Sequence, residues 1–169
     1  MGDFVKRVGH VGIHVSDVDR SVEFYRKTLG LKVTGKWAPP DFVRPICFMR
    51  CEEMHHDFVL FELPEDADRG NLTTEDSEHR KDVGLHHVAF EAHSRESWLE
   101  LHDHIKSLGI EFVSGPYVHG PEAEHMMSLI GGSGSHAFYF LDPDGNRVEV
   151  YCWMMRVTKP TLAAPNPDL

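Results

Sequence analysis

Two histidines and one glutamate are the residues of this sequence whose types and spacing best suit metal binding. His10 lies in the segment Gly-His-Val-Gly-Ile, and His87 lies in the similar segment His-His-Val-Ala-Phe 77 residues later. Glu149 lies within Arg-Val-Glu-Val-Tyr-Cys-Trp, where most of its neighbours are apolar. Two imidazoles and one carboxylate form a ligand set that holds a divalent iron and leaves coordination positions open. The sequence therefore predicts a metal site made by His10, His87 and Glu149.

Strands must carry these side chains, because the surrounding residues alternate between apolar and other types with a period of two. Around His10, the histidines and glycine of the strand share one side, and its valine and isoleucine residues share the other. Around Glu149, two valines and a cysteine share the apolar side, which leaves Glu149 and Tyr151 on the opposite one. A carboxylate in such a strand is costly to bury unless a cation or hydrogen bonds compensate its charge.

The order of predicted elements repeats once, which indicates an α+β fold built from two modules. Each module reads strand, helix, strand, strand, strand, and alone it would expose an apolar sheet face. In the second module we expect a strand at 110–113 and a long loop at 115–134. We predict one domain over 1–169, with module one at 5–64, a linker at 65–83, module two at 84–153 and a C-terminal tail at 154–169.

Composition excludes some classes of partner. The chain has 169 residues, with 17 basic and 27 acidic side chains and a net charge of −10, which argues against binding to nucleic acid or to an anionic membrane. Its three cysteines form no Cys-x-x-Cys pair, as expected for a reduced, cytoplasmic protein. Neither a long apolar run nor a signal peptide is visible in the sequence.

Three segments resemble a known superfamily. They are Gly-His-Val-Gly-Ile, His-His-Val-Ala-Phe and Phe-Tyr-Phe-Leu-Asp-Pro-Asp-Gly-Asn-Arg-Val-Glu-Val-Tyr. The chain resembles the vicinal oxygen chelate superfamily over about residues 5–153, a superfamily that includes glyoxalase I, epimerases, fosfomycin and bleomycin resistance proteins and extradiol dioxygenases. The resemblance implies paired βαβββ modules that form a cup around a metal, with His10, His87 and Glu149 as its ligands.

Within the superfamily, three further residues resemble those of the extradiol catechol dioxygenases. His56, in His-His-Asp-Phe-Val-Leu, matches their second-sphere histidine, and Tyr139 matches their active-site tyrosine. His119, in Gly-Pro-Tyr-Val-His-Gly, resembles a further histidine of those enzymes, although the segment lacks their arginine and lies farther from Tyr139. His125 or His136 could take the place of His119.

The number of protein ligands separates this class from its rivals. Isomerases and epimerases of the superfamily use a fourth ligand at the end of the first module, where one alignment places Leu60 and an alignment with one gap places Glu62. Leucine cannot bind a metal, whereas Glu62 could. A glyoxalase- or epimerase-like metal-dependent isomerase or lyase is therefore the alternative. A protein that sequesters bleomycin would need no metal triad.

The resemblance thus implies a short, single-domain extradiol dioxygenase that uses Fe(II), with Mn(II) as the alternative metal. Its substrates would be O2 and a small catechol, with L-DOPA as one candidate, and its product a muconic semialdehyde. In this interpretation His56 is the acid and base, Tyr139 hydrogen-bonds the substrate, and His119 stabilises the bound oxygen. Members of the superfamily commonly dimerise, and this resemblance together with the apolar residues at 153–157 favours a homodimer.

Overall fold

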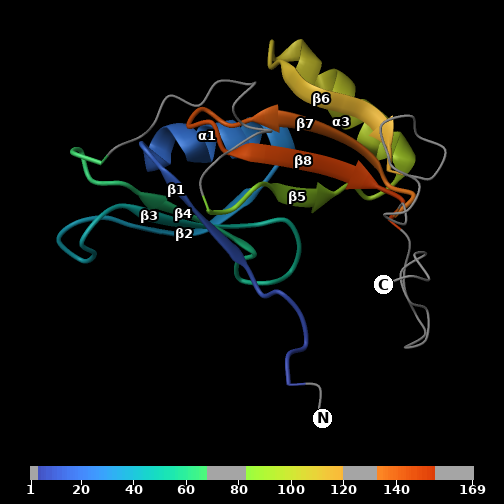
Figure 1. Cartoon of the computed structure of the whole chain (residues 1–169). Helices are drawn as coiled ribbons and strands as arrows, with labels where there is room; N and C mark the ends of the chain where they lie inside the picture. The colour runs from blue at the N-terminus through green and yellow to red at the C-terminus, as the bar shows by residue number, and fades with distance from the viewer. Residues whose placement is uncertain (1–3, 68–82, 120–132, 155–169) are drawn as a thin grey trace. The chain divides into compact units, whose positions relative to one another are not determined.

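The chain folds into two units of the same design (Figure 1). The computed structural model describes residues 4–67, 83–119 and 133–154. The first unit spans residues 1–72 together with the turn 142–144, and the second unit comprises the rest. The first contains β1 (Val11–Val15), α1 (Val18–Leu29), β2 (Lys32–Trp37), β3 (Ile46–Arg50) and β4 (Phe58–Glu62). The second contains β5 (Val88–Glu91), α3 (Arg95–Ser107), β6 (Phe112–Val118), β7 (His136–Leu141) and β8 (Arg147–Cys152). The predicted order, βαβββ twice, is confirmed.

In the first unit, the four strands form a mixed sheet in the order β1-β4-β3-β2. β1 and β4 are parallel, with Ile13 opposite Leu60 and His14 opposite Phe61. Residues opposite each other share a face, so the register separates an apolar face from a histidine-bearing face. Tyr25 of α1 lies against Phe58, with ring centroids 4.8 Å apart, and Phe58 shares the face of Leu60, which identifies the face that the helix covers.

Helix α1 has defined ends. The Asp17 side chain accepts a hydrogen bond from the backbone N–H of Arg20 at 2.9 Å, as expected of an N-cap residue. At the other end Gly30 has φ of 70°, the left-handed conformation in which a chain commonly leaves a helix.

In the second unit, the strands follow the corresponding order β5-β8-β7-β6. The indole N–H of Trp98 on α3 donates to the backbone oxygen of Val150 at 3.0 Å, and Phe138 lies against the same indole. Phe138 and Val150 are opposite each other in the β7–β8 register, so both lie on the face covered by α3. Glu149 lies on the other face, as the alternation predicted.

Strand β6 extends farther than we predicted. A strand was expected only at 110–113, but β6 continues to Val118 through Gly115. The register with β7 shifts between Ser114 and Tyr117, and pairing then resumes with Tyr117 opposite Ala137. Gly115 has φ of 83°, and a Cβ atom there would lie 2.6 Å from the backbone oxygen of Ala137. This glycine thus marks a bulge at a close backbone approach and not the start of a loop.

Parts of the predicted linker and tail, at 68–82 and 155–169, lie outside the described residues, as does His125. No helix in the described ranges is long and apolar enough to span a membrane.

A buried hydrogen bond within the first unit allows a stability test. The Tyr25 hydroxyl donates to Asp142 at 2.9 Å, and both residues are buried. Tyr25→Phe removes the donor and leaves a buried carboxylate with one bond fewer, so the free energy of unfolding should fall by about 1.5–3 kcal/mol. Denaturant unfolding measures this change. Tyr151→Phe, which removes the same hydroxyl from a half-exposed tyrosine, should change it by less than about 0.5 kcal/mol.

Candidate functional site

The second unit gathers four of the six residues that the sequence selected. Glu149 is central on β8, opposite Tyr139 of β7, and its exposed fraction is only 6%. Its Oε2 atom lies 2.9 Å from Nε2 of His87, which directly precedes β5. Nε2 of His119, which follows β6, lies 3.0 Å from the Tyr139 hydroxyl and 3.9 Å from Oε1 of Glu149. The four side chains therefore form one connected polar group.

Electrostatics keep Glu149 ionised and Tyr139 neutral. Burial raises the pKa of Glu149, but hydrogen bonds with His87 and Tyr139 and the charges of His87 and His119 outweigh it and lower the pKa below its ordinary value. The pKa of Tyr139 is raised well above its ordinary value by burial first, and then by the charge and hydrogen bond of Glu149. The phenol thus donates its only proton to the carboxylate, so at the 3.0 Å contact Nε2 of His119 is the donor to the phenol oxygen.

Arg147 is a residue of this site that our sequence interpretation missed. It is buried, its guanidinium carbon lies 4.5 Å from the centre of the Tyr139 ring, and its Nη2 donates to Ser114 Oγ at 2.6 Å. The cation over the ring acts to lower the pKa of Tyr139, but burial and the charge of Glu149 outweigh this effect. Strand alternation could have revealed it, because Arg147 lies two residues before Glu149 on the same face.

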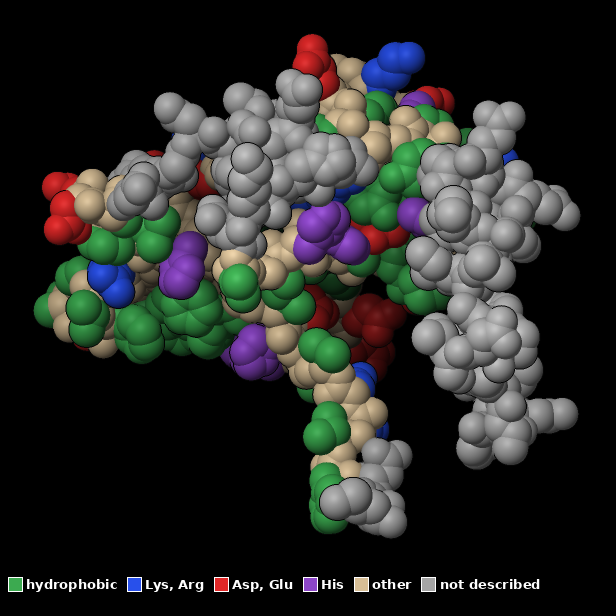
Figure 2. All heavy atoms as spheres, viewed as in Figure 1, with side chains coloured by type: hydrophobic (Ala, Val, Ile, Leu, Met, Phe, Trp, Pro, Cys, Tyr) green, Lys and Arg blue, Asp and Glu red, His purple; other side chains and the backbone are tan. Residues whose placement is uncertain are grey.

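The other two selected residues lie together in the first unit. The rings of His10 and His56 have centroids 4.8 Å apart. Phe48 stacks on His56 at 4.5 Å with an interplanar angle of 14°, and Nδ1 of His55 lies 3.0 Å from Nδ1 of His56. His10 and His56 are thus neighbours on an aromatic surface. Histidines also reach the surface at several places on the face seen in Figure 2.

Glu62 faces the helix side of its sheet. Its Oε2 atom accepts a hydrogen bond from the backbone N–H of Val18, the first residue of α1, at 2.9 Å. In the β1–β4 register Glu62 is opposite Val15, whereas the residue opposite His14 is Phe61. The residue at this end of β4 that shares the face of His14 is therefore Phe61, which offers no metal-binding atom. The geometry favours Glu62 as a helix cap over Glu62 as a metal ligand.

His136 does not replace His119 in the polar group. His136 and Tyr139 are three residues apart on β7, and side chains alternate along a strand, so the two point to opposite faces of the sheet. The ring of His136 contacts Trp98 and Trp153, with centroids 6.0 and 5.1 Å away. Burial and the charge of Arg95 lower its pKa. It belongs to the apolar packing beside α3.

The donor atoms suit a divalent metal. His87 and Glu149 bring an imidazole nitrogen and a carboxylate oxygen to one place, and a shared cation would replace their 2.9 Å contact. Among the described residues no three His, Cys, Asp or Glu side chains are already grouped as a metal site. The third predicted ligand, His10, belongs to the first unit.

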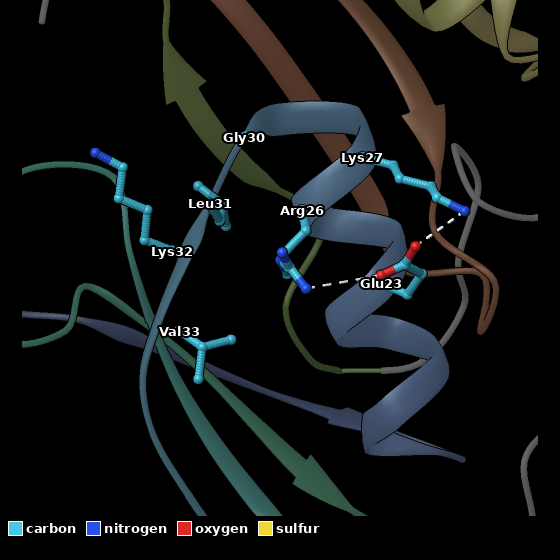
Figure 3. A pocket seen from close by; sticks show the side chains of 7 residues that line it. All are labelled: Glu23, Arg26, Lys27, Gly30, Leu31, Lys32 and Val33. Carbon is cyan, nitrogen blue, oxygen red and sulfur yellow. Dashed lines mark ion pairs between the residues drawn. The ribbon is translucent and has the colours of Figure 1, made fainter.

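A hollow of about 520 Å³ in the first unit contains none of the selected residues (Figure 3). It lies at the C-terminal end of α1, where Lys27 and Arg26 approach Glu23 at 2.9 and 3.9 Å. Its charged lining residues are thus largely engaged with one another.

Comparisons with known proteins agree with this architecture. The sequence matches the Glyoxalase/Bleomycin resistance protein/Dioxygenase superfamily over residues 7–150. None of the curated proteins compared with the sequence matches it.

Similar solved structures come from several bacteria. The genomically encoded fosfomycin resistance protein FosX from Listeria monocytogenes, complexed with Mn(II) and sulfate ion, has a TM-score of 0.55 and 15% identity, covering 88% of this chain and 93% of that one. Lactoylglutathione lyase from Agrobacterium tumefaciens has a TM-score of 0.55 and 21% identity, covering 89% and 96%. A glyoxylase/bleomycin resistance protein/dioxygenase domain from Frankia sp. EAN1pec has a TM-score of 0.61 and 18% identity, covering 88% and 98%.

The two βαβββ units define the vicinal oxygen chelate fold. The chain belongs to the glyoxalase/bleomycin resistance/dioxygenase superfamily. At these identities the solved structures support the fold alone.

The role of Glu62 can be tested by removing its carboxylate. Because Glu62 caps α1, Glu62→Ala should lower the free energy of unfolding by about 0.5–2 kcal/mol and leave the affinity for Mn(II) unchanged. Denaturant unfolding and calorimetric titration measure the two quantities. Asp17→Ala, which removes the N-cap of the same helix, is the matched control and should behave alike. If the affinity for Mn(II) becomes tenfold weaker in Glu62→Ala and not in Asp17→Ala, Glu62 is a fourth metal ligand.

The hydrogen bond from Tyr139 to Glu149 can be tested by titration. That bond favours the ionised carboxylate, so Tyr139→Phe should raise the pKa of Glu149 in the metal-free protein. Carboxyl carbon NMR as a function of pH measures the shift. Tyr151→Phe removes a hydroxyl that is not a cause of the Glu149 shift, and it should leave that pKa in place. A Glu149 titration that is identical in both variants contradicts the assigned bond.

Proposed function

We propose that the protein is a non-haem iron(II) extradiol dioxygenase that cleaves the ring of a small catechol to give a muconic semialdehyde. The observation that carries the proposal is the connected group of His119, Tyr139, Glu149 and His87. It joins two proposed ligands to the tyrosine and histidine that the resemblance to extradiol enzymes selects. Both oxygen atoms of O2 enter the product in this reaction class.

The proposed metal ligands are His10, His87 and Glu149. These residues would hold Fe(II), whose Lewis acidity would lower the pKa of the phenols of a catechol that chelates it, as metals do for bound water. A three-ligand set leaves positions for a bidentate substrate and for a gas molecule. Support comes from the helix-side position of Glu62, which leaves no carboxylate among the β4 residues on the histidine face. Mn(II) remains the alternative metal.

The protein side chains hold and move protons in this proposal. Tyr139 stays a neutral phenol and donates a hydrogen bond, which the substrate can take over from Glu149 once the carboxylate is engaged by a metal. His119 donates to the tyrosine oxygen and so fixes the direction of that donation. His56 is the proposed acid and base that accepts the catechol proton and later returns it. Phe48, stacked on its ring, restricts the orientation of that imidazole.

The groups around the proposed site support a catechol as the substrate. A catechol offers two adjacent oxygens to a metal, and the aromatic surface around Phe48 suits a planar ring. L-DOPA is the specific substrate we propose to test first. The homodimer expected from the sequence remains a prediction.

An isomerase or lyase of the glyoxalase type is the second candidate. It is favoured by the similarity of the fold to lactoylglutathione lyase from Agrobacterium tumefaciens. Such chemistry on a four-ligand centre would require Glu62 at the metal. The hydrogen bond from Val18 to Glu62 is the observation against it.

Oxygen consumption distinguishes the candidates. Protein loaded anaerobically with Fe(II) should consume one O2 per catechol and form a yellow product that absorbs in the visible range, with L-DOPA among the catechols tested. His87→Ala and Glu149→Ala should abolish uptake because each removes a ligand, and His104→Ala on α3 should retain it. His56→Phe should bind Fe(II) normally but turn over about a hundredfold more slowly, the usual contribution of a general acid or base.

One result would contradict the proposed reaction, and another would contradict only the role of His56. Conversion of the glutathione hemithioacetal of methylglyoxal by the metal-loaded protein, without O2 uptake on any catechol, would establish the isomerase candidate. Full turnover by His56→Phe would remove His56 from the mechanism and leave the rest intact.

A further inference from the structure

His86 and His87 form a direct hydrogen bond between their rings. Nδ1 of His86 lies 2.7 Å from Nδ1 of His87, and the rings are nearly perpendicular, with an interplanar angle of 80°. The other nitrogen of His87, Nε2, faces Glu149 at 2.9 Å. His87 thus has both ring nitrogens engaged, one by the carboxylate and one by His86. His86 is exposed and lies just before β5.

The donor and acceptor in this pair are determined by what Nε2 of His87 contacts. An ionised carboxylate only accepts hydrogen bonds, so Nε2 carries a proton while it faces Glu149. When the His87 ring is neutral, its Nδ1 is then an acceptor, and Nδ1 of His86 is the donor. A metal at Nε2 requires a lone pair there, which moves the proton of His87 to Nδ1. The hydrogen bond must then reverse, with His86 as the acceptor.

We propose that His86 is a positioning residue for the metal site: it accepts the Nδ1–H of His87 and so holds His87 in the tautomer and orientation that present Nε2 to a divalent metal. The inference rests on the proposed function only in taking His87 as a ligand. Reversal of the bond leaves His86 with its proton on Nε2. Because the His86 ring is exposed, water can carry that proton from one nitrogen to the other.

The expected size of the effect follows from exposure. Groups that hydrogen-bond the free nitrogen of a ligating histidine typically contribute 10- to 100-fold to metal affinity. His86 is exposed and the His87 side chain is one-third exposed, at 33%, so water can partly replace the bond. We therefore expect a loss near 10-fold when the acceptor is removed.

Zinc affinity measures the role of His86 independently of catalysis. Titration calorimetry of the metal-free protein with Zn(II) should show about tenfold weaker binding for His86→Phe, which keeps a ring but offers no acceptor. His86→Asn places an amide oxygen near the former Nδ1 position and should restore most of the affinity, which a merely structural role would not explain. His55→Phe, a change in the other paired histidine, is the matched control and should leave Zn(II) affinity unchanged.

Nitrogen NMR of the histidine rings reports the tautomer itself. In the wild-type protein saturated with Zn(II), His87 should carry its proton on Nδ1, whereas in the metal-free protein it should carry one on Nε2. Wild-type affinity for Zn(II) in His86→Phe, or no change of tautomer on binding, overturns the inference. If instead His87→Ala binds Zn(II) as tightly as the wild type does, the metal site of the proposed function fails, and the two failures are thereby distinguished.

Discussion

The structure of the candidate site depends on how the charge of Glu149 is compensated. A carboxylate in the middle of β8, with an exposed fraction of only 6%, would be protonated or destabilising without partners. His87 and Tyr139 approach it and His119 lies near, which lowers its pKa despite burial. The same contacts determine the directions of the neighbouring hydrogen bonds. Tyr139 must donate to Glu149, and His119 must then donate to Tyr139. One buried negative charge therefore orders the hydrogen bonds around it, and it is also the feature that makes a cation favourable there.

Strand register decides which side chains can take part. In each unit one face of the sheet is buried against a helix and the other carries the polar residues. A shift of one residue would exchange them. That is why adjacent residues have unrelated roles: Tyr139 lies in the polar group, whereas Phe138 packs against Trp98. The same rule turns Glu62 toward the start of α1 and places Phe61 on the face of His14.

Much of this could be predicted because strand periodicity is local. Alternation within one strand sorts Glu149 from its valine neighbours, and the turn between β7 and β8 sets Tyr139 opposite Glu149. Features that depend on contacts distant in sequence were missed. The bulge at Gly115 is required by the backbone of Ala137 on another strand, and nothing in the glycine itself distinguishes it from a loop residue. The contact of Arg147 with Tyr139 likewise needs the pairing of two strands before it can be recognised.

The chemistry proposed here depends on side chains that the fold does not dictate. A fosfomycin resistance protein and a lyase share this architecture with the chain at 15% and 21% identity, so the arrangement of strands is compatible with several reactions. An isomerase with a four-ligand centre would need the Glu62 carboxylate at the metal, whereas Glu62 accepts a hydrogen bond from the backbone N–H of Val18 at the start of α1. What this polar group offers is a neutral phenol whose direction of donation is fixed by His119. Such a donor suits a reaction in which oxygen atoms gain negative charge beside the metal, and ring opening of a catechol by O2 is of that kind.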